Sequence, residues 1–227
     1  MRAFLQAVDD FLRGRGPFAV GAPVAGRLRW LFAFVLVFGA FYGVVMGTFS
    51  GLAPGRFHQL LYSGAKVPLL MLVTFAFCLP SFFVVNTVAG LRDDFPEALQ
   101  AVVAAQSCIS LVLACLAPLT ALFYASCADY HSAILLNGLM FAIAWMTAQV
   151  VVRRYYAPLI RRSPTHRTML CAWFLVYVFV GIQMAWVLRP FVGAPGVPVT
   201  FFRQEAWGNA YVVVGGLIGQ LLGSAGG

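Results

Sequence analysis

The stretch ALQAVVAAQSCISLVLACLAPLTALFYASCA, residues Ala98–Ala128, contains no Asp, Glu, Lys or Arg. An uncharged apolar run of ~18 or more residues is long enough to cross a ~30 Å hydrocarbon core as a helix. Four further runs of this kind are Trp30–Ser50, Val67–Leu91, Ser132–Val152 and Met169–Leu188. The sequence therefore predicts an all-α integral membrane protein with a five-helix transmembrane bundle.

The composition agrees with one membrane domain. Hydrophobic residues make up 62% of the chain and charged residues 10%, whereas soluble proteins typically have ~45–50% and ~25%. The strands of a membrane barrel alternate in polarity over ~10 residues, and these runs do not. We expect an N-terminal segment (1–29), the bundle itself (30–190), and an outer loop with a glycine-rich helix (191–227).

The basic residues are distributed unevenly between the two predicted sides of the membrane. Eleven of the 15 precede the first run, lie at Arg92, or lie between the fourth and fifth runs at Arg153, Arg154, Arg161, Arg162 and Arg167. The other side holds Arg56, Lys66, Arg189 and Arg203. By the positive-inside rule we expect an inner-membrane protein whose N-terminus and 153–167 loop are cytoplasmic. This basic face is predicted to attract anionic lipid headgroups, and a nucleic-acid partner is not expected.

The two ends of the chain carry weaker signals. In residues 1–15 the apolar side chains gather on one helical face and most of the charges on the other, which predicts an amphipathic helix in the cytoplasmic interface. Residues 210–223 are apolar but short for a span, so they form an interfacial helix, a re-entrant helix or a marginal sixth span.

Glycines spaced by four form two rows. The first comprises Gly39, Gly43, Gly47 and Gly51, and the second comprises Gly215, Gly219, Gly223 and Gly227. Such a row, a glycine zipper, leaves a strip of bare backbone that lets helices approach closely in lipid. The partner helix belongs either to the same chain or to a second copy in a homo-oligomer.

Neutral polar residues and a proline interrupt the apolar runs. They are Pro80, Asn86, Gln106, Asn137, Gln149 and Gln183. Amides are costly against lipid, so they turn inward and hydrogen-bond between helices. They act either as interhelical contacts or as the lining of a polar pocket.

The acidic loops have structural explanations. Asp94 and Glu97 match an N-cap and its capping box for the third helix, and Asp129 matches an N-cap for the fourth. The group Cys127, Asp129 and His131 follows no zinc spacing, and no CxxC pair occurs among the five cysteines. We therefore expect no metal site, no cofactor and no catalytic residue.

The central part of the chain, about 65–190, is similar to the Yip1-like group of small polytopic membrane proteins. The similarity lies in Lys66–Val–Pro–Leu–Leu, Thr74, Cys78–Leu–Pro–Ser81, Asn86, Gly90 and Ala117–Pro118. The resemblance implies five helices, a cytoplasmic N-terminus and, in eukaryotic members, work in membrane traffic through protein partners. It assigns no functional residue.

Three functions compete. A non-enzymatic scaffold or accessory subunit of a membrane assembly would use helix packing and the basic face, with a membrane-protein partner or a second copy. A small-solute transporter or channel is the alternative, although ion-coupled pumps usually place ionisable groups within their spans. An intramembrane enzyme is the third, and no HExxH or GxSxG motif supports it. The sequence favours the first.

Overall fold

The computed structural model describes residues 2–20, 25–51, 56–193 and 198–202, and within them the chain is helical. The long helices follow one another in the order α1 (Arg2–Arg13), α2 (Ala25–Gly47), α3 (Phe57–Val88), α4 (Phe95–Ser126), α5 (Tyr130–Arg162) and α6 (Thr165–Leu188). Two 3₁₀ turns, Gly16–Phe18 and Thr48–Ser50, precede and follow α2.

Helices α2 to α6 are each long and apolar enough to cross a membrane, which confirms the five predicted spans. The chain is thus a multi-pass membrane protein whose first helix, α1, is shorter. Helices α3, α4 and α5 have 32, 32 and 33 residues. At ~1.5 Å per residue they are about 48 Å long, so they extend beyond a ~30 Å hydrocarbon core.

Two helices are longer than the sequence predicts. Helix α3 begins at Phe57, ten residues before the predicted run at Val67, and α5 continues through Arg153 and Arg154 to Arg162. Pro68 does not break α3, because neighbouring helices can compensate for a missing backbone hydrogen bond in a bundle. The predicted C-terminal helix at 210–223 lies outside the described residues.

Local sequence explains where α5 begins and where α3 ends. The side chain of Asp129 accepts a 2.7 Å hydrogen bond from the Ser132 amide and caps α5 as predicted. Gly90, with φ of 73°, ends α3, and the Leu91 amide returns to the Asn86 carbonyl at 2.9 Å. This is a Schellman motif, for which glycine is the favoured residue.

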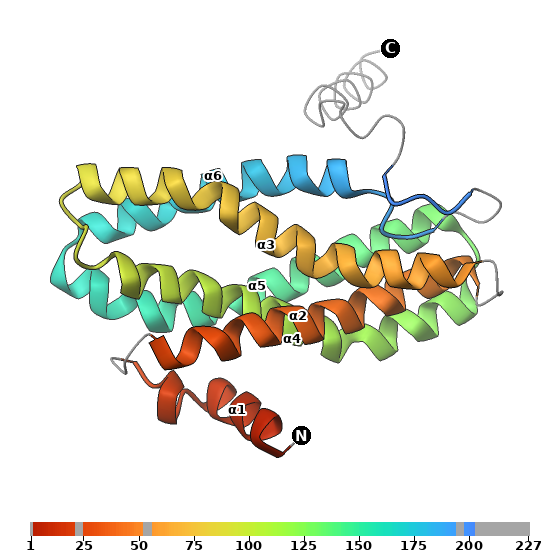
Figure 1. The fold of residues 1–227 in the computed structure, drawn as a ribbon, viewed down its shortest axis with the longest axis horizontal. Helices are drawn as coiled ribbons and strands as arrows, with labels where there is room; N and C mark the ends of the chain where they lie inside the picture. Colours follow the sequence, from red (N-terminus) through yellow and green to blue (C-terminus); the bar gives the residue numbers. More distant parts are fainter. Residues whose placement is uncertain (1, 21–24, 52–55, 194–197, 203–227) are drawn as a thin grey trace, which may run out of the picture.

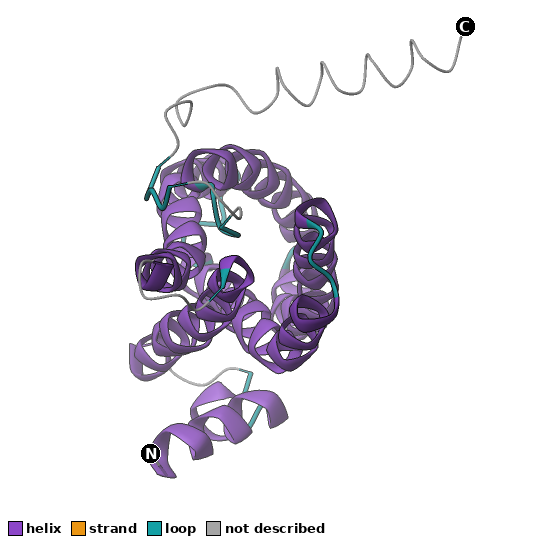
Figure 2. Cartoon of the chain, turned by 90° about the vertical axis from the view of Figure 1, so that its right-hand side faces the viewer, coloured by secondary structure: helices purple, strands orange, loops and turns teal. Residues whose placement is uncertain are grey.

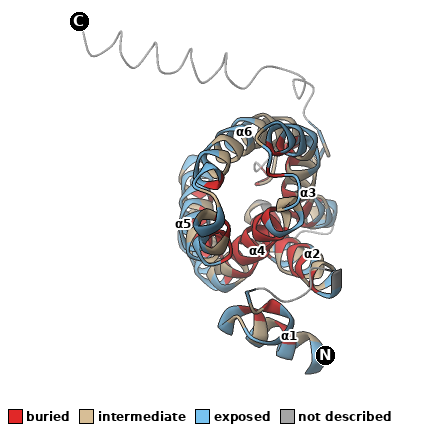
Figure 3. Ribbon diagram, turned by 90° about the vertical axis from the view of Figure 1, so that its left-hand side faces the viewer, coloured by how far each residue is buried: buried red, intermediate tan, exposed pale blue. Residues whose placement is uncertain are grey.

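Seen along the bundle, helices α3, α6, α5 and α4 surround the interior, with α2 outside against α3 and α4 (Figures 2 and 3). The most extensive helix contacts join α2 with α3, α4 with α5, and α2 with α4. The contacts between α5 and α6 and between α3 and α4 are small, so these two pairs form open seams between helices that are adjacent in the sequence.

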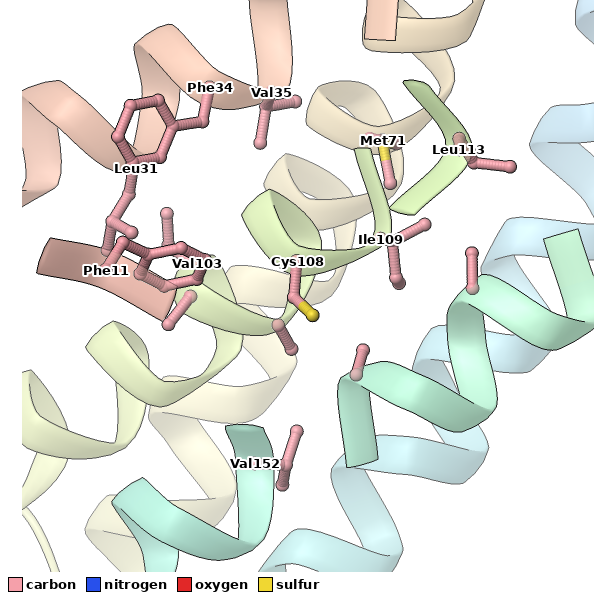
Figure 4. Packing of buried hydrophobic residues seen from close by; sticks show 14 of the residues in the cluster. Phe11, Leu31, Phe34, Val35, Met71, Val103, Cys108, Ile109, Leu113 and Val152 are labelled. Carbon is pink, nitrogen blue, oxygen red and sulfur yellow. The ribbon is translucent and has the colours of Figure 1, made fainter. Parts of the chain in front are cut away.

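The core runs along α4, in which every residue from Gln100 to Leu111 is buried. Figure 4 shows Val103, Cys108, Ile109 and Leu113 of α4 in one cluster with residues of α2 and α3. Small side chains on α4 allow close approach to α2, where the Ser107 hydroxyl donates to the Leu31 carbonyl at 2.9 Å.

The first glycine row lies on the face of α2 that contacts α3. A Cβ added at Gly43 would overlap the Ser63 carbonyl oxygen and come within 2.9 Å of Gly64 Cα. At Gly47 it would lie 2.9 Å from Leu60 Cα, and at Gly39 it would lie 3.5 Å from Pro68. These three glycines therefore contact a helix of their own chain. A Cβ at Gly51 meets nothing, and the second row lies outside the described residues.

Helix α1 packs on α2 through aromatic rings. Phe4 lies with its ring centroid 5.4 Å from that of Phe34, and Phe11 lies 5.8 Å from the same ring. The opposite face of α1 is exposed and carries an ion pair of 2.7 Å between Asp9 and Arg13. Phe4 and Phe11 of α1 are thus packed against this protein's own span, whereas Leu5 and Leu12 remain exposed.

Candidate functional site: an apolar interior between the helices

The interior contains a cavity of about 990 Å³, here called the chamber. Its wall comes from α3, α4, α5, α6 and the segment that follows α6, with Met46 of α2 at one edge. The lining is almost wholly apolar or aromatic, and includes Leu70, Met71, Ile109, Ile134, Phe141, Trp145, Tyr177, Val178, Ile182, Trp186 and Phe191. Apolar cavities of ~300–1,000 Å³ are typical of small-molecule sites.

Small residues on α5 and α6 widen the chamber. Gly138 and Ala142 of α5 line it, as do Gly181 and Ala185 of α6. A Cβ added at Gly138 would meet no atom within 4 Å. Because α5 and α6 also touch little, the chamber lies beside a loosely packed seam between these two helices.

Asn137 lines the chamber, and its side-chain amide takes part in a hydrogen-bond network between helices. The Tyr42 hydroxyl donates to Asn137 Oδ1 at 2.9 Å. The Asn137 Nδ2 donates to the Tyr124 hydroxyl at 2.5 Å and to the Ala133 carbonyl at 2.7 Å. Asn137 thus connects α2, α4 and α5, which is the interhelical role that the sequence suggested for such amides.

The segment after α6 is fastened to α3 at the end of the chamber. Lys66 is fully buried, and its Nζ donates to the Pro190 carbonyl at 2.7 Å. The Ser63 hydroxyl donates to the Phe191 carbonyl at 2.5 Å. The Arg189 guanidinium stacks over the Trp186 ring, 3.1 Å from its centroid. These contacts position Pro190 and Phe191 as part of the chamber wall.

A second cavity of about 270 Å³, here called the end pocket, lies between α4, α5 and α6, toward the turn that joins α5 to α6. It shares Ile109, Trp145 and Tyr177 with the chamber, so the two cavities adjoin at these three residues, here called the neck. Its remaining lining is Val102, Ala105, Gln106, Ala148, Gln149, Val152, Arg167, Leu170, Cys171, Trp173 and Phe174.

The polar residues of the end pocket are Gln106, Gln149 and Arg167. Gln106 is only 2% exposed, yet neither its Nε2 nor its Oε1 has a hydrogen-bond partner in the described structure. Gln149 makes one long contact of 3.4 Å, to the Trp145 carbonyl of its own helix. An unpaired buried amide is costly, so Gln106 is the polar side chain of this pocket that gains most from a hydrogen-bonding ligand.

An ionic cluster ties α4 to the α5–α6 turn. His166 Nε2 lies 2.9 Å from one oxygen of Asp94, and Arg162 lies 3.0 Å from the other. Glu97 pairs with Arg162 at 3.2 Å. The hydrogen bond with His166, together with Arg162, lowers the pKa of the Asp94 carboxyl.

The predicted capping box is therefore wrong at Asp94. This residue occupies the N-cap position of α4, but its side chain makes no capping hydrogen bond. The reason is that His166 and Arg162, distant in sequence, provide partners to both carboxylate oxygens.

The six residues of the predicted polar pocket do not form one site. Gln106 and Gln149 meet in the end pocket, and Asn137 lines the chamber. Pro80 is exposed, and the buried Asn86 donates to the Phe82 carbonyl of its own helix. Gln183 is half-buried on α6 and lines neither cavity.

The predicted basic face is also divided. All five of its arginines are exposed, but Arg162 belongs to the ionic cluster and Arg167 lines the end pocket. Arg154 reaches the turn at Gly14, where its guanidinium would lie 2.8 Å from an added Cβ.

Sequence reasoning missed the chamber and its neck. Trp145 and Tyr177 appear in the sequence as ordinary apolar or aromatic residues of spans, and only Gly138 and Gly181 hinted at a wide space between α5 and α6. No family model, curated protein or solved structure with which the chain was compared matches it.

Proposed function

We propose that this protein is a non-enzymatic accessory subunit of the membrane that binds the hydrocarbon chain of a lipid in its interior. The observation that carries the proposal is the apolar chamber of about 990 Å³ beside the loosely packed α5–α6 seam. An apolar cavity next to lipid is filled at little cost by the chains that already surround the protein.

The lining of the interior favours a lipid chain. The chamber is almost wholly apolar, and the end pocket adjoins it at the neck. A lipid chain is much thinner than a helix and bends around the neck residues Ile109, Trp145 and Tyr177.

The absence of turnover is part of the proposal, and the bonding of the ionisable groups supports it. Asp94 and Glu97 pair with Arg162, and Asp129 caps α5. In the described structure no three His, Cys, Asp or Glu side chains come together in a group that suits a metal ion.

The assembly in which the protein works belongs to the proposal as well. The Yip1-like resemblance, whose eukaryotic members act through protein partners, favours an accessory role in an inner membrane. The basic N-terminal and 153–167 segments favour a cytoplasmic position for that side. The lipid would then be a structural component at the contact with the partner.

The test compares the lipid retained by the purified full-length protein with that retained by chamber-filling variants. Gly138→Trp and Ala142→Trp place an indole in the chamber, whereas Leu139→Trp and Ile143→Trp place it on neighbouring positions outside both cavities. After exchange into mild detergent and addition of phosphatidylcholine, native mass spectrometry counts the bound lipids.

We expect the parent and both outward variants to retain lipid and both inward variants to lose it, while all four keep helical circular dichroism. Equal retention by Gly138→Trp, Ala142→Trp and the parent would contradict the proposal. So would a photocrosslink from position 138 to a partner protein or to this chain's own residues 203–227.

Transport of a small apolar solute is a second candidate, because the chamber and the end pocket meet at the neck and together follow α6 from Arg167 to Arg189. These 22 residues correspond to about 33 Å, the thickness of a ~30 Å core. Flux of an apolar dye into vesicles that depends on the protein and is blocked by Gly138→Trp would favour transport.

A further inference from the structure

We infer that the end pocket binds the anionic headgroup of a lipid whose chain runs into the interior. This inference rests on the proposed function, because it assigns a headgroup to the lipid whose chain the interior holds. The ligand is an anionic phospholipid, in which a phosphate and a hydrogen-bonding glycerol backbone stand at the end of an apolar chain.

Gln106 places a buried amide in the wall of the end pocket. Its amide is 98% buried with both polar atoms unpaired in the described structure, and it lines the end pocket. An amide needs both an acceptor and a donor as partners. A phospholipid provides ester carbonyls, on the chain side of its phosphate, as acceptors for the Gln106 Nε2 donor.

Arg167 places a positive charge in the wall of the same pocket. It lines the end pocket from the first turn of α6, and its guanidinium has no carboxylate partner in the part of the chain that the structure describes. Arg162, by contrast, is neutralised by Asp94 and Glu97. An arginine left with its charge at the mouth of an apolar pocket suits a phosphate, to which it donates charge-assisted hydrogen bonds.

The dimensions of α6 agree with a lipid of the leaflet on this side. Tyr177, at the neck, is ten residues further along the helix than Arg167, or about 15 Å. Half of a ~30 Å hydrocarbon core is also about 15 Å. The chain of a lipid whose phosphate lies on Arg167 therefore reaches the neck and enters the chamber there.

General attraction of lipid to basic residues is the competing explanation, and the chain offers a control for it. Arg161 has the same charge and is exposed like Arg167, but it lines neither cavity. Nonspecific attraction of lipid would weaken equally on the loss of either arginine. Lipid binding in the end pocket would weaken only on the loss of Arg167.

The experiment measures binding of phosphatidylglycerol and phosphatidylcholine with identical chains to the full-length protein in mild detergent, by native mass spectrometry. We expect the parent to prefer phosphatidylglycerol and Arg167→Gln to reduce this preference about tenfold, the effect of losing one charge-assisted contact. Arg161→Gln should leave the preference unchanged. Soluble glycerol phosphate should compete weakly, because it lacks the chain.

Gln106→Leu adds a readout that a merely structural amide would not give. Removing an unpaired buried amide should leave the thermal midpoint of the lipid-free protein unchanged or raise it, while phosphatidylglycerol affinity falls several-fold. A lower midpoint with unchanged affinity would make Gln106 structural and overturn the inference.

The two proposals fail in different ways. If Gly138→Trp abolishes lipid retention but Arg167→Gln and Arg161→Gln change the headgroup preference equally or not at all, the headgroup inference is wrong and the chain site remains. If glycerol phosphate displaces phosphatidylglycerol at equal concentration, the end pocket is a phosphate site without a chain. If Gly138→Trp and Ala142→Trp retain all lipid, the interior is not a chain site and both proposals fall.

Discussion

Gly43 determines how closely α2 and α3 approach. Any side chain there would overlap the Ser63 carbonyl oxygen, which belongs to backbone and cannot rotate away. Gly138 provides the opposite case on α5, because an added Cβ meets open space. Both glycines lie inside helices. Replacement by alanine therefore tests helix packing at Gly43 and helix propensity at Gly138.

We predict that Gly43→Ala destabilises the protein by about 3 kcal/mol, the upper part of the usual range for overpacking. Gly138→Ala should change stability by less than about 1 kcal/mol, in the favourable direction that helix propensity gives. Thermal or denaturant unfolding in mild detergent measures both. Equal stability of Gly43→Ala and the parent would show that this glycine is not a packing position.

Asp94 shows how a local sequence motif is replaced by distant partners. The D-x-x-E pattern predicts a helix cap, yet the carboxylate joins α4 to His166 and Arg162. Its pKa is lowered from the ordinary value of 3.8 by these contacts. A carboxyl whose pKa is lower in the folded state adds stability above its unfolded pKa and loses that stability as pH falls through the folded pKa.

We therefore predict that the parent loses stability below about pH 4 and that Asp94→Asn shows less of this loss. At neutral pH the variant should be less stable by roughly 1 kcal/mol, since the cluster is partly solvated. Melting from pH 7 to pH 3 tests both points. Asp93→Asn, an exposed neighbour, is the control, and an identical pH profile for Asp94→Asn and the parent would refute the prediction.

At the scale of elements, α1 is held by few contacts. Phe11 is 3% exposed and packs between Phe18 and Phe34, whereas its neighbour Leu12 is 52% exposed. The loop that follows is held separately, through the Tyr155 hydroxyl, which donates to the Phe18 carbonyl at 2.7 Å.

We predict that Phe11→Ala releases α1 from α2 without unfolding the bundle, because the loss of roughly 3 kcal/mol of ring packing falls on this element alone. Hydrogen exchange of residues 2–13 should accelerate in Phe11→Ala and stay unchanged in Leu12→Ala. Equal protection of α1 in the two variants would mean that the aromatic contacts do not hold it.

For the whole molecule, the arrangement of basic residues predicts the orientation. We expect Ser163→Cys, in the α5–α6 turn, to react with a membrane-impermeant maleimide only from the cytoplasmic side. Ser126→Cys, at the end of α4, should react only from outside. Both variants are made after replacement of the five natural cysteines. Labelling of Ser163→Cys from outside would reverse the assigned topology.

The sequence by itself determined the all-α class and the existence of five spans, because uncharged runs of this length have few other stable states in lipid. It also determined local features with short-range causes. Asp129 caps α5 through an amide three residues away, and the row from Gly39 to Gly47 faces another helix.

Only the tertiary structure decided which residues share a site. Gln106, Gln149 and Arg167 lie on three different helices and form the end pocket only because of the crossing of α4, α5 and α6. The chamber exists because α5 and α6 separate while α4 packs tightly on α2. Apolar runs encode crossing the membrane but carry little information on which neighbour each helix chooses, since every face is compatible with lipid.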